Sequence, residues 1–196
     1  MIKYPGGQSF EKEEIKSSPK KEKKVLLSAR NRGMSLENDI NISNEYYIEH
    51  DIAVITKRPT PINVVKVDYS RGALITQAYF EEQSTTDYNG VFQGKYIDFE
   101  AKSTQKDTSF PLNNITKHQI KHLERVIRHG GIAFFIIEFV HLNEYYLLDA
   151  KYVIDFYNNQ ERKSIPYKAI KENGKLIKQG VRPRLHYLDI VKELYF

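Results

Sequence analysis

The clearest alternation of apolar and polar residues runs from Lys95 to Ser103 and predicts a β-strand. Successive side chains of an extended chain point to opposite faces, so this segment would have one apolar and one charged face. The apolar set is Ile97, Phe99 and Ala101, and the charged set is Asp98, Glu100 and Lys102. An apolar face packs into a core, whereas three charges in a row on the other face indicate a functional surface.

The same patterning predicts an α/β fold for the rest of the chain. One helix is expected from Ser35, which would be its N-cap, with Leu36, Ile40 and Tyr47 near one face and Glu37 in the first turn. A second helix would be capped by Thr116 and end near His129, before Gly130-Gly131. The remaining expected elements are strands at 52–56 and 132–139, both expected to be central, further strands at 62–67, 73–80 and 144–148, and a short helix at 150–157.

The length of 196 residues suits one domain, expected at 29–196, preceded by a flexible basic arm at 1–28. The arm is rich in lysine and has little to bury, so it is either a solvated tail or an added attraction for phosphates. A second basic window, from Arg162 to Arg184, is either a DNA-binding patch or a solubilising surface. Asn173-Gly174 inside it is typical of a hairpin turn.

Composition excludes several classes of function. The formal net charge is +5, and the chain has no cysteine, which rules out disulfides, thiolate zinc sites and cysteine nucleophiles. The pair His118 and His122 has helical spacing but no third ligand, so a basic outer face for DNA is favoured over zinc. No apolar run approaches the roughly 20 residues of a membrane span. We therefore expect a soluble cytoplasmic protein without a membrane partner.

Asp87 completes a candidate metal site with the charged face of the predicted strand. Asn89-Gly90 has the composition of a hairpin turn, and such a turn would fold Asp87 back beside Glu100. Two carboxylates so placed form the hard oxygen site that Mg²⁺ or Mn²⁺ prefers. Lys102, two residues after the second acid, can stabilise the negative charge that builds on a phosphate under attack.

The order Asp87, then Glu100-x-Lys102, resembles the metal-dependent nucleases with the signature P-D…(D/E)-x-K. Further segments extend the likeness: Asn31-Arg32-Gly33 leading into Ser35-Leu36-Glu37, then Thr85-Thr86-Asp87-Tyr88, Tyr96-Ile97-Asp98-Phe99-Glu100-Ala101-Lys102, and His118-Gln119. From about Arg30 onward, the chain resembles the RecU family, Holliday junction resolvases of Gram-positive bacteria. Asp98 shares the charged face but has no ligand role in that motif, so its loss is expected to be tolerated.

The resemblance implies a restriction-endonuclease-like α/β core, a mixed sheet flanked by helices, with an inserted β stalk at about 57–82. It implies a magnesium-dependent endonuclease, with Mn²⁺ as a possible substitute, that cleaves four-way DNA in recombination and repair with two ions per site. The implied metal ligands are Thr85, Asp87, Glu100 and Gln119, with Lys102 as transition-state stabiliser and Glu37 as a secondary candidate. The implied DNA-binding residues are Arg32, Lys57, Arg58, Lys66 and Arg71, the last at the stalk turn.

Two other hypotheses about function are also consistent with the sequence. The chain could bind branched DNA or a recombinase without cutting, or it could be a restriction-type endonuclease that reads sequence in duplex DNA. Resolving a junction requires two cuts related by symmetry, so the junction hypothesis also predicts a homodimer. A recombinase of the RecA type is a further candidate partner.

Overall fold

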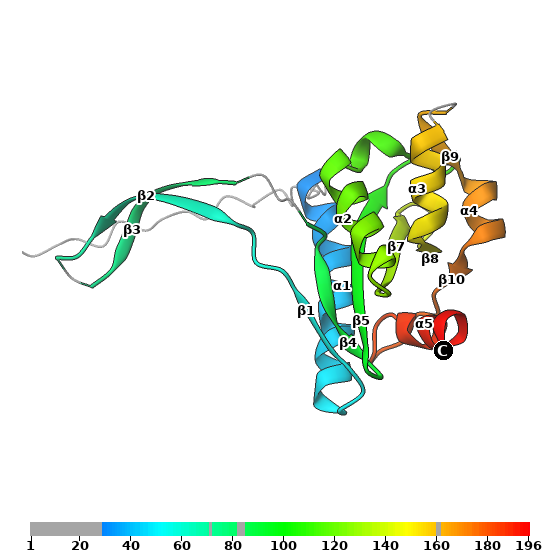
Figure 1. Ribbon diagram of the computed structural model, residues 1–196, viewed down its shortest axis with the longest axis horizontal. Coiled ribbons are helices and arrows are strands. Elements are labelled where there is room, and N and C mark those ends of the chain that lie inside the picture. Colours follow the sequence, from blue (N-terminus) through cyan, green and yellow to red (C-terminus); the bar gives the residue numbers. More distant parts are fainter. Residues whose placement is uncertain (1–28, 71, 82–84, 160–161) are drawn as a thin grey trace, which may run out of the picture.

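The computed structural model in Figure 1 describes residues 29–70, 72–81, 85–159 and 162–196, with side chains described from Leu36 onward. Its helices are α1 (Ala29–Glu49), α2 (Lys117–Arg128), α3 (Ala150–Asn159), α4 (Tyr167–Asn173) and α5 (Tyr187–Tyr195), with a 3₁₀ turn η1 (Leu112–Asn114). Its strands are β1 (Val54–Lys57), β2 (Ile62–Asp68), β3 (Leu74–Phe80), β4 (Tyr88–Phe92), β5 (Lys95–Thr104), β6 (Ser109–Pro111), β7 (Ile132–Phe139), β8 (Glu144–Asp149), β9 (Ser164–Pro166) and β10 (Lys175–Leu176). The predicted α/β class is confirmed.

The body of the fold is a six-stranded mixed sheet in the order β1-β4-β5-β7-β8-β10. β5 and β7 are parallel, so the chain between them must cross over, and α2 makes that crossover. The other pairs in this sheet are antiparallel. All eight residues of β7 are buried, which confirms the prediction that this strand is central. Helices α1 and α5 cover one face of the sheet, and α2, α3 and α4 cover the other.

The alternation along β5 separates the core from the charged face as predicted. The ring of Phe99 is stacked between those of Tyr88 and Phe134, with centroids 4.9 and 4.7 Å away. Each such pair stabilises the fold by about 0.5–1.5 kcal/mol beyond the free energy gained by burying the rings. The opposite face of β5 looks toward α2, so the core fixes where the charged side chains lie.

The β4–β5 hairpin forms, but its turn is not at Asn89-Gly90. These residues lie inside β4, and the turn is made by Gln93 and Gly94, whose φ angles are 47° and 79°. Gly90 has a different role, because a Cβ there would come within 2.0 Å of the Val54 carbonyl on β1. The glycine therefore allows two strands to approach. Tyr88 pairs with Phe99, so Asp87 still comes opposite Glu100 as expected.

Three other local predictions are wrong. The strand at 52–56 was expected to be central, yet β1 is an edge strand with Val54 60% exposed. Helix α1 begins at Ala29, so Ser35 is not its N-cap and Glu37 is not in its first turn, although Leu36, Ile40 and Tyr47 are buried as predicted. Asn173-Gly174 is not a hairpin turn, because Asn173 ends α4 and Gly174 caps it.

Strands β2 and β3 form a separate two-stranded sheet that projects from the body (Figure 1). This hairpin lies within the predicted stalk insertion, and most of its side chains are exposed. Arg71, expected at its turn, lies outside the described residues, as does the predicted arm at 1–28. Among the described residues, no helix has the length and apolar content to span a membrane.

Candidate active site

Glu100 is the centre of the candidate site. It lies in the middle of β5 with its side chain fully buried. Its Oε1 accepts a hydrogen bond from Gln119 Nε2 at 2.6 Å and lies 2.6 Å from the Lys102 ammonium. Its Oε2 has no hydrogen-bond partner among the described residues. A buried carboxylate oxygen without a partner is costly in an apoprotein, so an unpaired atom here indicates a site for a ligand.

Asp87 approaches Glu100 from the start of β4. Its Oδ2 accepts a hydrogen bond from the Ala101 N–H at 3.3 Å, and its backbone carbonyl accepts one from the Arg58 N–H at 2.8 Å. Burial and the nearby Asp87 charge raise the pKa of Glu100 to about 8, against the opposing effect of Lys102. The single charge of Lys102 does not balance two carboxylates held together in this way, and a divalent cation would supply the missing positive charge.

Gln119 reaches the site because of how α2 begins. Thr116 and Gln119 form a capping box, in which the Thr116 hydroxyl accepts from the Gln119 N–H and the Gln119 Oε1 accepts from the Thr116 N–H at 2.9 Å. The amide nitrogen is then directed at Glu100. The resemblance implies that Gln119 is a metal ligand, which would use the side-chain oxygen, but here that oxygen caps the helix while the NH₂ group donates to Glu100.

The donors at this site suit a hard divalent cation. Among the described residues, no group of three or more histidine, cysteine, aspartate or glutamate side chains is arranged to hold a metal ion. The protein ligands would therefore be the pair Asp87 and Glu100, helped by oxygen from Thr85, with water or phosphate completing the shell. Thr85 is partly buried, two residues before Asp87. The unpartnered Glu100 Oε2 is the observation that makes these residues fit a metal.

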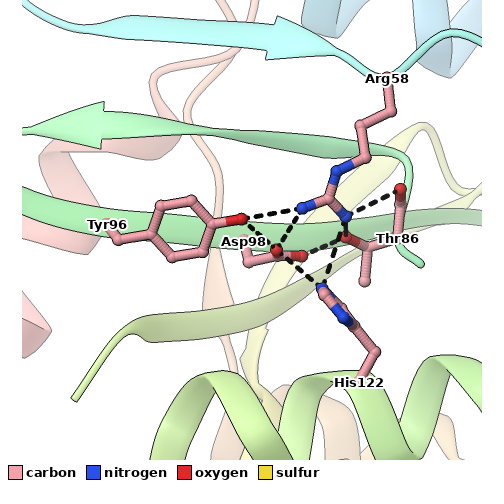
Figure 2. A network of polar contacts seen from close by, with 5 residues as sticks. All are labelled: Arg58, Thr86, Tyr96, Asp98 and His122. Atoms are coloured by element: carbon pink, nitrogen blue, oxygen red, sulfur yellow. Dashed lines mark hydrogen bonds and ion pairs between the residues drawn. The ribbon is translucent and has the colours of Figure 1, made fainter. Parts of the chain in front are cut away.

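Asp98 is the hub of a second polar cluster, which the sequence did not reveal (Figure 2). Its buried carboxylate accepts hydrogen bonds from Arg58 at 2.7 Å, Tyr96 at 2.8 Å and His122 at 2.9 Å, and from the Thr86 hydroxyl. Burial alone would raise the pKa of Asp98, but these hydrogen bonds and the Arg58 charge lower it below its ordinary value. Asp98 is thus a paired carboxylate, whereas Glu100 keeps a free oxygen.

Several of the other predicted site residues form ion pairs with side chains of this chain. Lys57 Nζ lies 2.6 Å from Glu37 Oε1, so a proposed DNA contact and a proposed secondary acid pair with each other. The Arg58 guanidinium is engaged by Asp98. Lys66 is exposed on β2. The side chain of Arg32, like Arg71, is outside the described residues.

The raised pKa of Glu100 predicts how pH affects stability. In the presence of a chelator, the folded state holds this proton more tightly than the unfolded state, whose ordinary pKa is 4.5. The stability contributed by Glu100 is therefore complete below pH 4.5 and is lost as pH rises through about 8. Mg²⁺ needs the carboxylate, so it should raise the melting temperature more at pH 8.5 than at pH 6.

Thermal unfolding of the wild type and Glu100→Gln at both pH values, with chelator or Mg²⁺, checks this expectation. The amide of the variant does not titrate, so the variant should lose less stability with rising pH and gain little from Mg²⁺. Equal pH slopes for the two proteins would contradict it.

Fold and site together define a class, an α/β protein with a mixed sheet in which Asp87, just before β4, lies beside Glu100 and Lys102 of β5, the residue types of the metal-dependent nuclease signature. The sequence model of one family, described as RecU, recombination protein U, matches residues 31–193. The chain belongs to the RecU family, as the resemblance of its motifs indicated.

Relatives match over the whole chain. A Holliday junction resolvase RecU of Geobacillus sp. strain WCH70 is 50% identical over 201 residues, covering 100% of this chain and 98% of the relative. The protein of the same name from Bacillus cytotoxicus is 49% identical over 200 residues, with the same coverage. A solved structure of Hjc, a Holliday junction resolvase of Archaeoglobus fulgidus, aligns with TM-score 0.42 and 10% identity, covering 72% of this chain and 93% of that one.

Proposed function

We propose that this chain is a Holliday junction resolvase, an endonuclease that uses divalent ions to cleave phosphodiester bonds in four-way DNA. The observation that carries the proposal is the buried Glu100, with one unpartnered oxygen, beside Asp87 and Lys102. Membership of the RecU family and the names of its full-length relatives support the same function.

Each residue of the site then has a distinct task. Bound Mg²⁺ or Mn²⁺, with two ions in the scheme we favour, would activate the attacking water and stabilise the leaving oxygen. Asp87 and Glu100 hold the cations, and Thr85 adds an oxygen ligand. Gln119 orients Glu100 through its amide. Lys102, 23% exposed beside Glu100, would stabilise charge on the scissile phosphate.

The DNA would be held by basic surfaces away from the carboxylates. A groove of about 550 Å³ is lined by Lys106, Arg162 and Lys163, with Tyr157 and the η1 turn completing its wall. Such a groove suits the phosphate backbone of one junction arm. Lys66, which is exposed on β2, would place the stalk against the branch point. Arg71, which the sequence predicts at the turn of the stalk, would act with it. Two cuts of like polarity require two sites, so we propose a two-fold homodimer.

A cleavage assay of the purified protein tests this function. With Mg²⁺ or Mn²⁺ we expect paired cuts in strands of like polarity on a four-way junction, and little cutting of a linear duplex of the same sequence. Binding without cutting under both metals would favour the non-cleaving module. Equal cutting of the linear duplex at a fixed sequence would favour a restriction-type endonuclease.

A further inference from the structure

The root of the stalk lies directly against the candidate site. The outgoing chain leaves β1 at Lys57 and Arg58, and the returning chain enters β4 through the segment Thr85–Asp87. The Arg58 N–H donates to the Asp87 carbonyl at 2.8 Å, one step beyond the Lys57 and Tyr88 pair that ends the β1–β4 ladder. The two legs of the stalk therefore meet at Arg58.

The Arg58 side chain ties both legs to β5 (Figure 2). One terminal nitrogen donates to the Thr86 hydroxyl at 2.8 Å and approaches the Thr86 carbonyl at 3.4 Å. The other donates to Asp98 at 2.7 Å and to the Tyr96 hydroxyl at 2.8 Å. The Thr86 hydroxyl in turn donates to Asp98. A planar guanidinium with several donors can hold two partners in fixed positions at once.

The contacts of this cluster are buried rather than superficial. Thr86 and Asp98 are both 0% exposed, and the Arg58 side chain is 17% exposed. A buried carboxylate that loses its cation is left with an uncompensated charge, which is costly. The guanidinium therefore neutralises Asp98. This argues against the contact with a DNA phosphate that the resemblance implied for Arg58.

We propose that Arg58 is a positioning residue for the active site, a role that rests on the proposed function. Thr86 stands between the candidate ligands Thr85 and Asp87 in the sequence, and its hydroxyl contacts both Arg58 and Asp98. Holding Thr86 in place therefore also holds its two neighbours. Arg58 holds this segment at two points, the Asp87 carbonyl and the Thr86 hydroxyl. It sets the distance from Asp87 to Glu100 and joins the stalk root to the site. A misplacement of about 1 Å at such a site can cost on the order of 100-fold in rate.

The variants Arg58→Lys, Arg58→Gln and Thr86→Val test this role. Arg58→Lys keeps the charge but has no fork, so it separates positioning from a simple contact with DNA. Thr86→Val removes the hydroxyl from the other side of the same cluster. Lys95→Gln is the control, since Lys95 lies at the far end of β5 and its ammonium binds the Tyr195 carbonyl.

The measurements are junction affinity in chelator, single-turnover cleavage against Mg²⁺ concentration, and melting temperature. We expect all three test variants to cleave about 10- to 100-fold more slowly and to need more Mg²⁺ for half-maximal rate. Their junction affinity should stay within about twofold, and Arg58→Gln combined with Thr86→Val should lose less than the product of the two single losses. Lys95→Gln should match the wild type.

Several results would overturn the role of Arg58. One is wild-type cleavage by Arg58→Lys, and another is a loss of junction affinity that equals the loss of rate. A third is a cleavage rate that falls only in proportion to the fraction of unfolded protein, with no change in the Mg²⁺ requirement. Glu100→Gln run in parallel keeps the two hypotheses apart: if it still cleaves, the proposed site is wrong, and if it alone is inactive, only the role of Arg58 is wrong.

Discussion

Asp87→Asn is expected to bind four-way junctions with nearly wild-type affinity and to cleave them about a thousandfold more slowly or worse. The substitution preserves size and shape but removes one of the two charges that attract the cations. The Ala101 N–H can still donate to the remaining side-chain oxygen, so the hairpin should keep its geometry. Metal binding should also weaken. Single-turnover cleavage, junction binding in chelator and Mn²⁺ titration measure the loss of rate, the retained affinity and the weaker metal binding.

Asp155→Asn provides the matched control, because it makes the same chemical change at an exposed position on α3. It should bind metal and cleave as the parent does. If Asp87→Asn cleaved within about tenfold of the parent, or bound Mn²⁺ equally well, Asp87 could not be a metal ligand.

Lys102→Ala is expected to lose cleavage to a similar extent for a different reason. The ammonium is 2.6 Å from Glu100 Oε1, and in the proposed site it would supply positive charge where a phosphate acquires negative charge. Removing it takes away that stabilisation while leaving both carboxylates in place. Metal binding should therefore persist, because a cation that competes for Glu100 is gone. The variant should bind Mn²⁺ at least as well as the parent at pH 8.5 and still fail to cut.

Lys192→Ala, on the exposed side of α5, removes a charge of the same kind far from the site. Its cleavage rate should be unchanged. Parental cleavage by Lys102→Ala, or a loss of metal binding as large as that of Asp87→Asn, would show that the lysine has a different role.

The charged face of β5 could be predicted from sequence because strand alternation is a local property. Its partners could not, because they come from distant segments. Asp98 meets Arg58 across 40 positions of sequence and His122 across 24. The helical spacing of Gln119 and His122 was the available signal, since both lie on the side of α2 that faces β5. Gln119 contacts Glu100 and His122 contacts Asp98, so one helix binds both acids of the charged face.

The turn between β4 and β5 shows that a short motif can have the composition of a turn without forming one. Asn89-Gly90 matches a hairpin turn, but the glycine is required because the Val54 carbonyl lies against it. Gln93-Gly94 makes the turn instead. Pairing between strands, which short motifs do not encode, decided between these positions. The position of Asp87 opposite Glu100 was nevertheless predicted correctly.

The separation of the β2–β3 hairpin from the main sheet affects how such proteins can diversify. The hairpin has its own ladder of hydrogen bonds, and both its legs are fixed at Arg58 and Thr86. Adding one residue to each strand would lengthen the projection by about 3.3 Å. Such a change would leave the register of β4 and β5 untouched. The reach of the hairpin can therefore vary by paired insertions, whereas one extra residue in the Gln93-Gly94 turn would shift Asp87 away from Glu100.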